Sequence, residues 1–89
     1  MYKHAELAKC DLSAVLYELY GSEINVSISS FWDGGWEVKL GDEMNGFIAT
    51  TNVKDIFAAG QWLAEEAFVR YPDSKFALLY GASIGLVFK

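Results

Sequence analysis

The spacing of apolar residues divides the chain into helical and extended segments. Over residues 5–20, apolar side chains recur every three or four positions, which is the period of an amphipathic helix. Gly21 is suited to end this helix. Asp11 is a favourable N-cap, so the pattern also allows a break there and a shorter helix that begins after it. The sequence therefore predicts a helix within 1–22, with two alternative starts.

The following segment, 23–51, alternates between apolar and polar side chains, as strands with one buried face do. The predicted strands cover residues 24–32, 36–40 and 47–51. Asp33, Gly34 and Gly35 tolerate the positive φ angles of a tight turn and separate the first two strands. A second connection over 41–46 joins the second strand to the third. We expect an antiparallel three-stranded sheet.

A second helix is predicted over residues 53–71, within the segment 52–72. Asn52 as N-cap with Asp55 three residues later forms a pair similar to a capping box, and Pro72 closes the far end. The stripe expected to face inward comprises Val53, Ile56, Phe57, Gly60, Leu63, Ala64, Ala67, Phe68 and Tyr71. At 100° per residue, Trp62 lies opposite Val53 and close to Val69, so it needs a cover.

The last segment, 73–89, is an apolar tail that contains an uncharged run over 76–88. The pattern leaves open whether the tail is a helix or a strand. Either it folds back over Trp62 in the same chain, or two chains stack these surfaces as a homodimer. Gly81 and Gly85 would let two backbones approach closely, which favours the dimer. The residues predicted for this tail or oligomer interface are Trp62, Val69, Phe76 and Leu79.

The order helix, three strands, helix and apolar tail indicates a single α+β domain over 1–89, in which one antiparallel sheet packs its apolar face on the helices. The chain has 89 residues and a net charge of −5. Residues 1–44 hold three lysines and eight acids, whereas 45–89 are balanced. Binding to a phosphate backbone needs clustered Lys and Arg, so the charge disfavours a nucleic-acid-binding module and suits a basic protein partner.

Residues that could carry chemistry are few. His4 is the single histidine and Cys10 the single cysteine, too few ligands for a transition-metal site. Residues 42–46 lack the ligand spacing of a calcium-binding loop. We therefore expect no enzyme, no metal and no cofactor. One unpaired cysteine suits a reducing cytoplasm, and the uncharged run of thirteen residues over 76–88 is too short to cross a membrane.

The hypothesis for the contact surface rests on the two connections that flank the middle strand. Their acids could steer a basic partner during association. The predicted partner-binding residues are Trp36, Glu37, Asp42 and Glu43.

Residues 24–66 resemble the N-terminal domain of HicB-type antitoxins. The run from Asp33 to Trp36 matches the aspartate-glycine-glycine-aromatic hairpin of that family, and Asp42 matches an acid in its next loop. Residues 53–67 match its helix in length and apolar spacing. The family's appended DNA-binding domain has no counterpart in the seventeen residues after Pro72. The resemblance implies a domain that inhibits a partner protein without recognising an operator.

The order of elements also resembles the double-stranded-RNA-binding domain. That family carries lysines at the start of its last helix, where this chain offers Lys54 beside Asp55. An alternative to the antitoxin is a phage or mobile-element inhibitor of a nucleic-acid-binding enzyme, similar to anti-CRISPR proteins, in which carboxylates take the place of phosphates. Both leading interpretations describe a small, acidic protein that occludes the surface of another protein.

Overall fold

The computed structural model describes residues 7–42 and 47–85 of the chain. Its elements follow the order α2 (Leu12–Gly21), β1 (Val26–Phe31), β2 (Gly35–Asp42), β3 (Phe47–Val53), α3 (Ile56–Arg70) and α4 (Lys75–Ser83). The three strands form one antiparallel sheet in the order β1-β2-β3. The predicted α+β class and the helix–sheet–helix order are confirmed.

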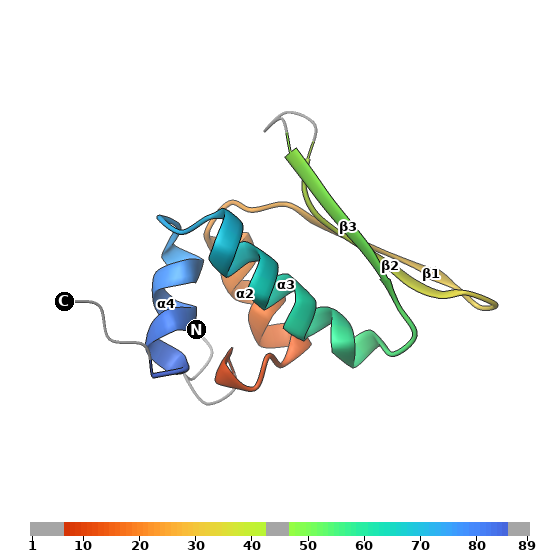
Figure 1. Cartoon of the computed structure of the whole chain (residues 1–89), viewed down its shortest axis with the longest axis horizontal. Helices are drawn as coiled ribbons and strands as arrows, with labels where there is room; N and C mark the ends of the chain where they lie inside the picture. Colours follow the sequence, from red (N-terminus) through yellow and green to blue (C-terminus); the bar gives the residue numbers. More distant parts are fainter. Residues whose placement is uncertain (1–6, 43–46, 86–89) are drawn as a thin grey trace.

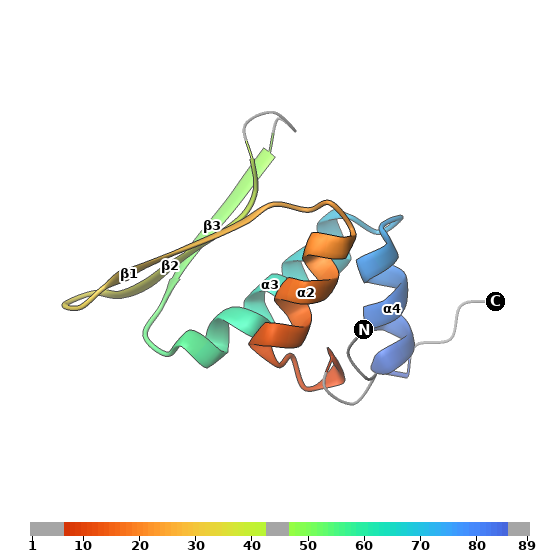
Figure 2. The same cartoon turned by 180° about the vertical axis from the view of Figure 1, so that it is seen from behind.

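The helices cover one face of the sheet. α3 packs against β2 and β3, α2 packs beside α3, and α4 packs against α2 and α3 on the side away from the sheet (Figures 1 and 2). Val38 and Leu40 of the central strand are fully buried under α3, while Ser27 and Ser29 of β1 remain exposed. The alternation predicted for the strands therefore describes the covered and the open face correctly.

α2 follows the second of the two predicted starts. Cys10 has a positive φ of 58°, which interrupts a helix. Asp11 then acts as N-cap, and its carboxylate accepts a hydrogen bond of 3.2 Å from the backbone N–H of Ala14. A continuous helix over 5–20 is wrong, because the chain turns at Cys10 before α2 begins.

α3 begins later than predicted, and its N-cap is Asp55 instead of Asn52. Trp36 of β2 pairs with Val53, so the ladder keeps residues 52 and 53 extended. Asp55 caps the helix instead, accepting from the N–H of Phe57 at 2.9 Å. Phe57 is 76% exposed rather than inward. It lies in the first turn of α3, which extends past α2 in Figure 2.

α2 and α3 meet at Gly60. A Cβ at this position would lie 2.3 Å from the carbonyl oxygen of Cys10 and 3.2 Å from Leu12. Real Cβ atoms do not approach backbone so closely, because steric repulsion rises steeply. Glycine at this position therefore allows the two backbones to be neighbours.

Within the apolar tail, Lys75–Ser83 form the helix α4, which packs on its own chain. Phe76 in α4 is fully buried, and its N–H donates to Ser22 Oγ at 2.8 Å. Its ring stacks on Tyr80 at a centroid distance of 5.8 Å, and Tyr80 meets Phe68 of α3 edge to face at 5.6 Å. Gly81 is buried as well.

The remaining residues of the predicted tail or oligomer interface do not share one environment. Trp62 and Leu79 are half-buried and pack against the core, whereas Val69 is 71% exposed. Trp62 is thus already partly covered by its own chain and does not need a second chain to cover it.

Candidate functional site

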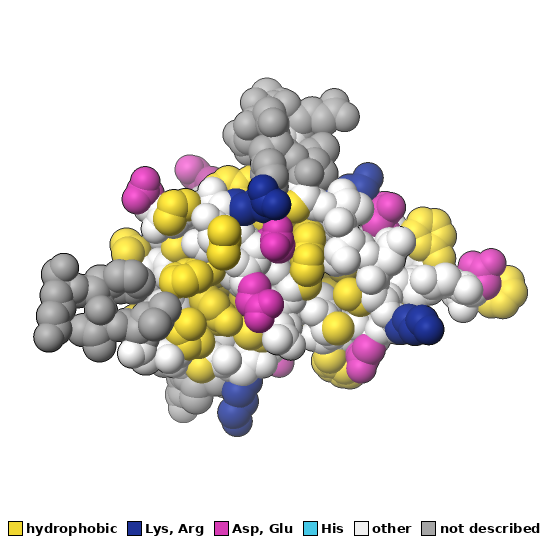
Figure 3. Space-filling model, in the orientation of Figure 1, with side chains coloured by type: hydrophobic (Ala, Val, Ile, Leu, Met, Phe, Trp, Pro, Cys, Tyr) yellow, Lys and Arg dark blue, Asp and Glu magenta, His cyan; other side chains and the backbone are white. Residues whose placement is uncertain are grey.

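The largest exposed aromatic side chains of the described sheet lie at the turn between β1 and β2. Trp32 is 97% exposed and Phe31 is 51% exposed. This turn is the end of the molecule farthest from α4 (Figure 1). In the same orientation, Figure 3 shows hydrophobic side chains beside an acidic one at that end. We call residues 30–36 the hairpin tip.

The hairpin tip has a defined backbone. The N–H of Gly34 donates to the carbonyl of Phe31 at 2.9 Å and closes the turn. Gly35 has a φ of +88°, and a Cβ there would lie 2.6 Å from the carbonyl oxygen of Val53. Only glycine combines this φ with so close an approach. The end of β3 thus supports the tip, so Trp32 is presented from an ordered turn.

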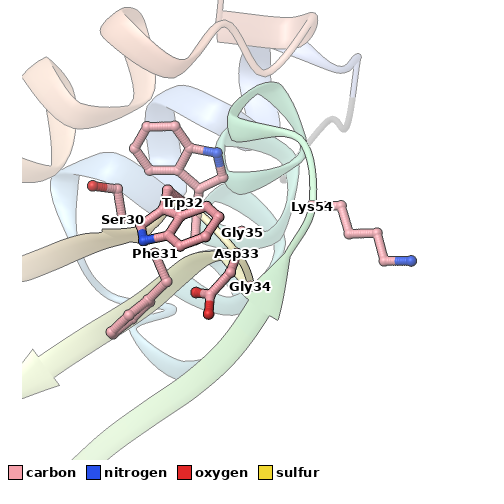
Figure 4. A pocket seen from close by; sticks show the side chains of 8 residues that line it. Ser30, Phe31, Trp32, Asp33, Gly34, Gly35 and Lys54 are labelled. Atoms are coloured by element: carbon pink, nitrogen blue, oxygen red, sulfur yellow. The ribbon is translucent and has the colours of Figure 1, made fainter.

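A shallow hollow of about 550 Å³ lies at the tip. Its lining residues are Ser30, Phe31, Trp32, Asp33, Gly34, Gly35, Trp36 and Lys54. Figure 4 shows the aromatic rings around it, with the Lys54 side chain extending away from them. Asp33 is therefore the charged group that stays beside the aromatic rings, and the tip is apolar with a negative edge.

The residues predicted to bind a partner do not form one surface. Trp36 is half-buried and shares its strand face with the buried Val38, whereas Glu37 points to the opposite face. Asp42 ends β2 six residues further on, at roughly 20 Å from Trp36 for an extended strand. Glu43 lies outside the described residues.

The two acids that the structure describes already have partners. Glu37 Oε1 lies 3.7 Å from Lys39 Nζ, and Asp42 accepts a hydrogen bond from the side-chain amide of Asn25. The described part of β2 therefore does not present a row of free carboxylates that could imitate phosphates.

Phe31 and Trp32 were missed as site residues, although the sequence held a signal for them. The alternation that buries Val38 and Leu40 places Trp36 on the same covered face. Trp32, by contrast, falls in the turn, where the chain reverses and the sheet offers no cover. An aromatic residue inside a glycine-rich turn was the better candidate for an exposed contact.

Other reactive groups are sparse in the described part of the chain. Cys10 Sγ lies 3.5 Å from the Tyr80 hydroxyl, and burial, followed by this contact and the nearby Glu65, raises the pKa of Tyr80 above its usual range. Within residues 7–42 and 47–85, no three His, Cys, Asp or Glu side chains are placed to hold a metal ion. His4 lies outside these residues. The described helices include none long and apolar enough to cross a bilayer.

No family model, curated protein or solved structure matches this chain.

Proposed function

We propose that the chain is a non-enzymatic protein-binding domain whose contact surface is the hairpin tip. The observation that carries this proposal is the 97% exposure of Trp32 on an ordered turn. Exposing a tryptophan to water is unfavourable, since burial of a large aromatic side chain contributes about 1.5–3 kcal/mol. Tryptophan is also enriched among the residues that dominate binding energy at protein interfaces.

The partner surface that fits this tip has an apolar depression with a basic rim. Phe31 and Trp32 would enter the depression, and Asp33 would face the basic rim. The net charge of −5 would speed the approach of a basic partner. Because the described part of the chain offers no catalytic group of residues at the tip, binding itself is the proposed activity.

An inhibitor is the form of this function that the sequence favours. The resemblance to HicB-type antitoxins covers the segment that forms the sheet and α3, and the tip coincides with the matching aspartate-glycine-glycine hairpin. In this proposal the tip enters and occludes a surface that the partner needs. The described acids of β2 are already paired, which favours an apolar contact over the imitation of phosphates.

Photo-crosslinking in cells that express the chain tests this proposal. A benzoylphenylalanine is placed at position 32, and a control chain carries it at Leu78, which is 57% exposed on α4 at the other end of the molecule. We expect one protein to be captured from position 32 and not from position 78. Equal capture from both positions, or capture from neither, would contradict the proposal.

Affinity measurements on the captured partner then test the role of the side chain. Trp32→Ala should weaken binding by about 30-fold, the equivalent of the ~2 kcal/mol that marks a binding hot spot. Leu78→Ala is the matched control and should leave the dissociation constant unchanged. An unchanged dissociation constant for Trp32→Ala would remove the tip from the interface.

A further inference from the structure

β1 is an open edge of the sheet. Its extensive contacts are with β2, whereas α3 packs against β2 and β3. The N–H of Gly41 donates to the carbonyl of Asn25 at 2.8 Å. Asn25 and Gly41 are therefore a hydrogen-bonded pair of the antiparallel ladder, and the backbone groups of Asn25 point towards β2. Because such pairs alternate, the backbone groups of Val26, Ile28 and Ser30 point away from β2. These three residues offer their N–H and C=O groups at the edge.

The β1 edge also lacks the features that normally protect an edge strand. Natural edges are blunted by charged side chains, proline or bulges. The sequence of β1 is VSISSF, with no charge and no proline. In a chain with a net charge of −5, a symmetric contact between two copies must avoid opposing like charges. β1 satisfies this condition along its own length, Val26–Phe31.

The outward groups of β1 are self-complementary. If two β1 strands pair antiparallel about Ile28, Ile28 lies opposite Ile28 of the second copy, and Val26 lies opposite Ser30. All three are positions with outward backbone groups, so the pairing forms about six backbone hydrogen bonds. The half-buried side chains of Val26 and Ile28 gain neighbours on the helix-covered side.

The same register brings together two exposed features of the molecule. An open hollow of about 430 Å³ lies between α2 and the start of β1. It is lined by Leu16, Tyr17, Tyr20, Ile24, Asn25 and Val26, and we call it the α2–β1 hollow. Tyr17 and Tyr20 are 52% and 85% exposed. In the register centred on Ile28, Phe31 lies opposite Asn25 of the second copy, which lines this hollow, so the backbone of each hairpin tip reaches the rim of the other copy's hollow.

We infer that the free chain forms a symmetric dimer in which two β1 strands pair about Ile28 into one six-stranded sheet, and each hairpin tip lies on the α2–β1 hollow of the other copy. This inference rests on the proposed function, because it names a second copy as a weaker occupant of the same tip. The α2–β1 hollow is apolar, but its described lining holds no Lys or Arg to face Asp33. A target protein that takes the tip then competes with self-association.

Charge variants of the exposed serines test the register. In this pairing Ser27 lies opposite Ser29 of the second copy. The double variants Ser27→Glu/Ser29→Glu and Ser27→Lys/Ser29→Lys each oppose like charges and should dimerise at least about tenfold more weakly than the parent chain. A mixture of the two should form a heterodimer, and Ser27→Glu/Ser29→Lys should dimerise by itself.

Light scattering over a dilution series is the measurement. The parent chain should reach twice its mass of 9.9 kDa. A parent chain that stays monomeric throughout would overturn the inference, and so would like-charged variants that dimerise as well as the parent. Far-UV circular dichroism of each variant confirms that the fold is intact.

Crosslinking of the purified chain separates this inference from the proposed function. Benzoylphenylalanine at position 32 should crosslink to residues 16–26 of a second copy. Crosslinks to a different protein in cells, with none between purified copies, would overturn the dimer and support the proposed function. No crosslink from position 32 in either setting would overturn both.

Discussion

The two ends of the molecule use their aromatic residues in opposite ways. At the helical end, Phe76 is fully buried and stacks on Tyr80, which in turn meets Phe68. At the other end, Trp32 is 97% exposed and Phe31 is 51% exposed. The helical end buries apolar area and thereby stabilises the fold, while the tip leaves apolar area available for another molecule.

At both ends, nevertheless, a glycine lets two backbone segments lie in close contact. Gly60 allows α3 to touch the backbone before α2, and Gly35 allows the tip to touch the end of β3. The difference therefore lies in what the side chains meet, not in how well the backbone is held. An ordered but uncovered aromatic turn is typical of a binding surface, since an ordered contact loses less conformational entropy on association.

The largest expected effect separates the two ends directly. Phe76→Ala should lower the free energy of unfolding by about 3–5 kcal/mol, because it leaves a cavity among α2, α3 and α4. Trp32→Ala is the matched aromatic truncation at the tip and, at protein concentrations low enough to keep the chain monomeric, should change it by less than about 0.5 kcal/mol. Urea denaturation of both variants measures the difference. Similar losses would show that the tip also contributes to the core.

The next effect concerns the contact between α2 and α3. Gly60→Ala should destabilise the chain by about 1–3 kcal/mol, because the added Cβ meets the Cys10 carbonyl and the backbone must move. Gly21 is the last residue of α2, and a Cβ added there would have nothing within 4 Å. Gly21→Ala should therefore be neutral or slightly stabilising. Thermal unfolding of both variants tests this. Equal melting temperatures would show that the two helices do not touch at Gly60.

The sequence predicted the sheet more accurately than the helix ends. Alternation identified the buried Val38 and Leu40 because the period of a strand is fixed by its geometry. The cap of α3 was misassigned because Asn52 and Asp55 are both good caps locally, and the choice between them depends on β3 pairing through Val53. That pairing joins residues distant in sequence.

The position of the turn was predictable from the sequence, but the exposure of its aromatic residues was not. The aspartate-glycine-glycine turn was recognised, yet Trp36 was chosen over Trp32. Exposure at the tip depends on how far the helices extend under the sheet, and local propensity does not encode that distance. For the tail, apolar character predicted burial, and its described part buries Phe76 but leaves Leu78 and Ile84 exposed. The pattern did not indicate that Phe76 and Tyr80 would pack against Phe68 of the same chain.

A smaller effect tests the corrected start of α3. Asp55→Ala should cost about 0.5–2 kcal/mol, because the N–H of Phe57 loses its side-chain acceptor. Asn52→Ala, at an exposed position of β3, should stay within about 0.5 kcal/mol of the parent. Chemical denaturation distinguishes them. A larger loss for Asn52→Ala would restore the cap predicted from sequence.

The smallest effect appears only in alkaline solution and belongs to the helical end. Burial, followed by the hydrogen bond with Cys10, raises the pKa of Tyr80. An unfolded tyrosine titrates near a pKa of about 10. As the pH rises past that value, the unfolded chain releases this proton while the folded chain retains it. The unfolded state then binds fewer protons than the folded state, so stability falls with rising pH.

Removing the Tyr80 hydroxyl should remove that part of the pH dependence. Tyr80→Phe keeps the ring that stacks on Phe76, so the fold should persist, but its stability should fall less steeply above about pH 10 than that of the parent. Urea midpoints measured on both sides of that pH give the comparison. A Tyr80→Phe slope equal to the parent's would mean that the hydroxyl ionises as readily in the folded chain as in the unfolded one. The contact of Tyr80 with Cys10 would then be open to solvent, and the helical end would be less closed than its buried rings indicate.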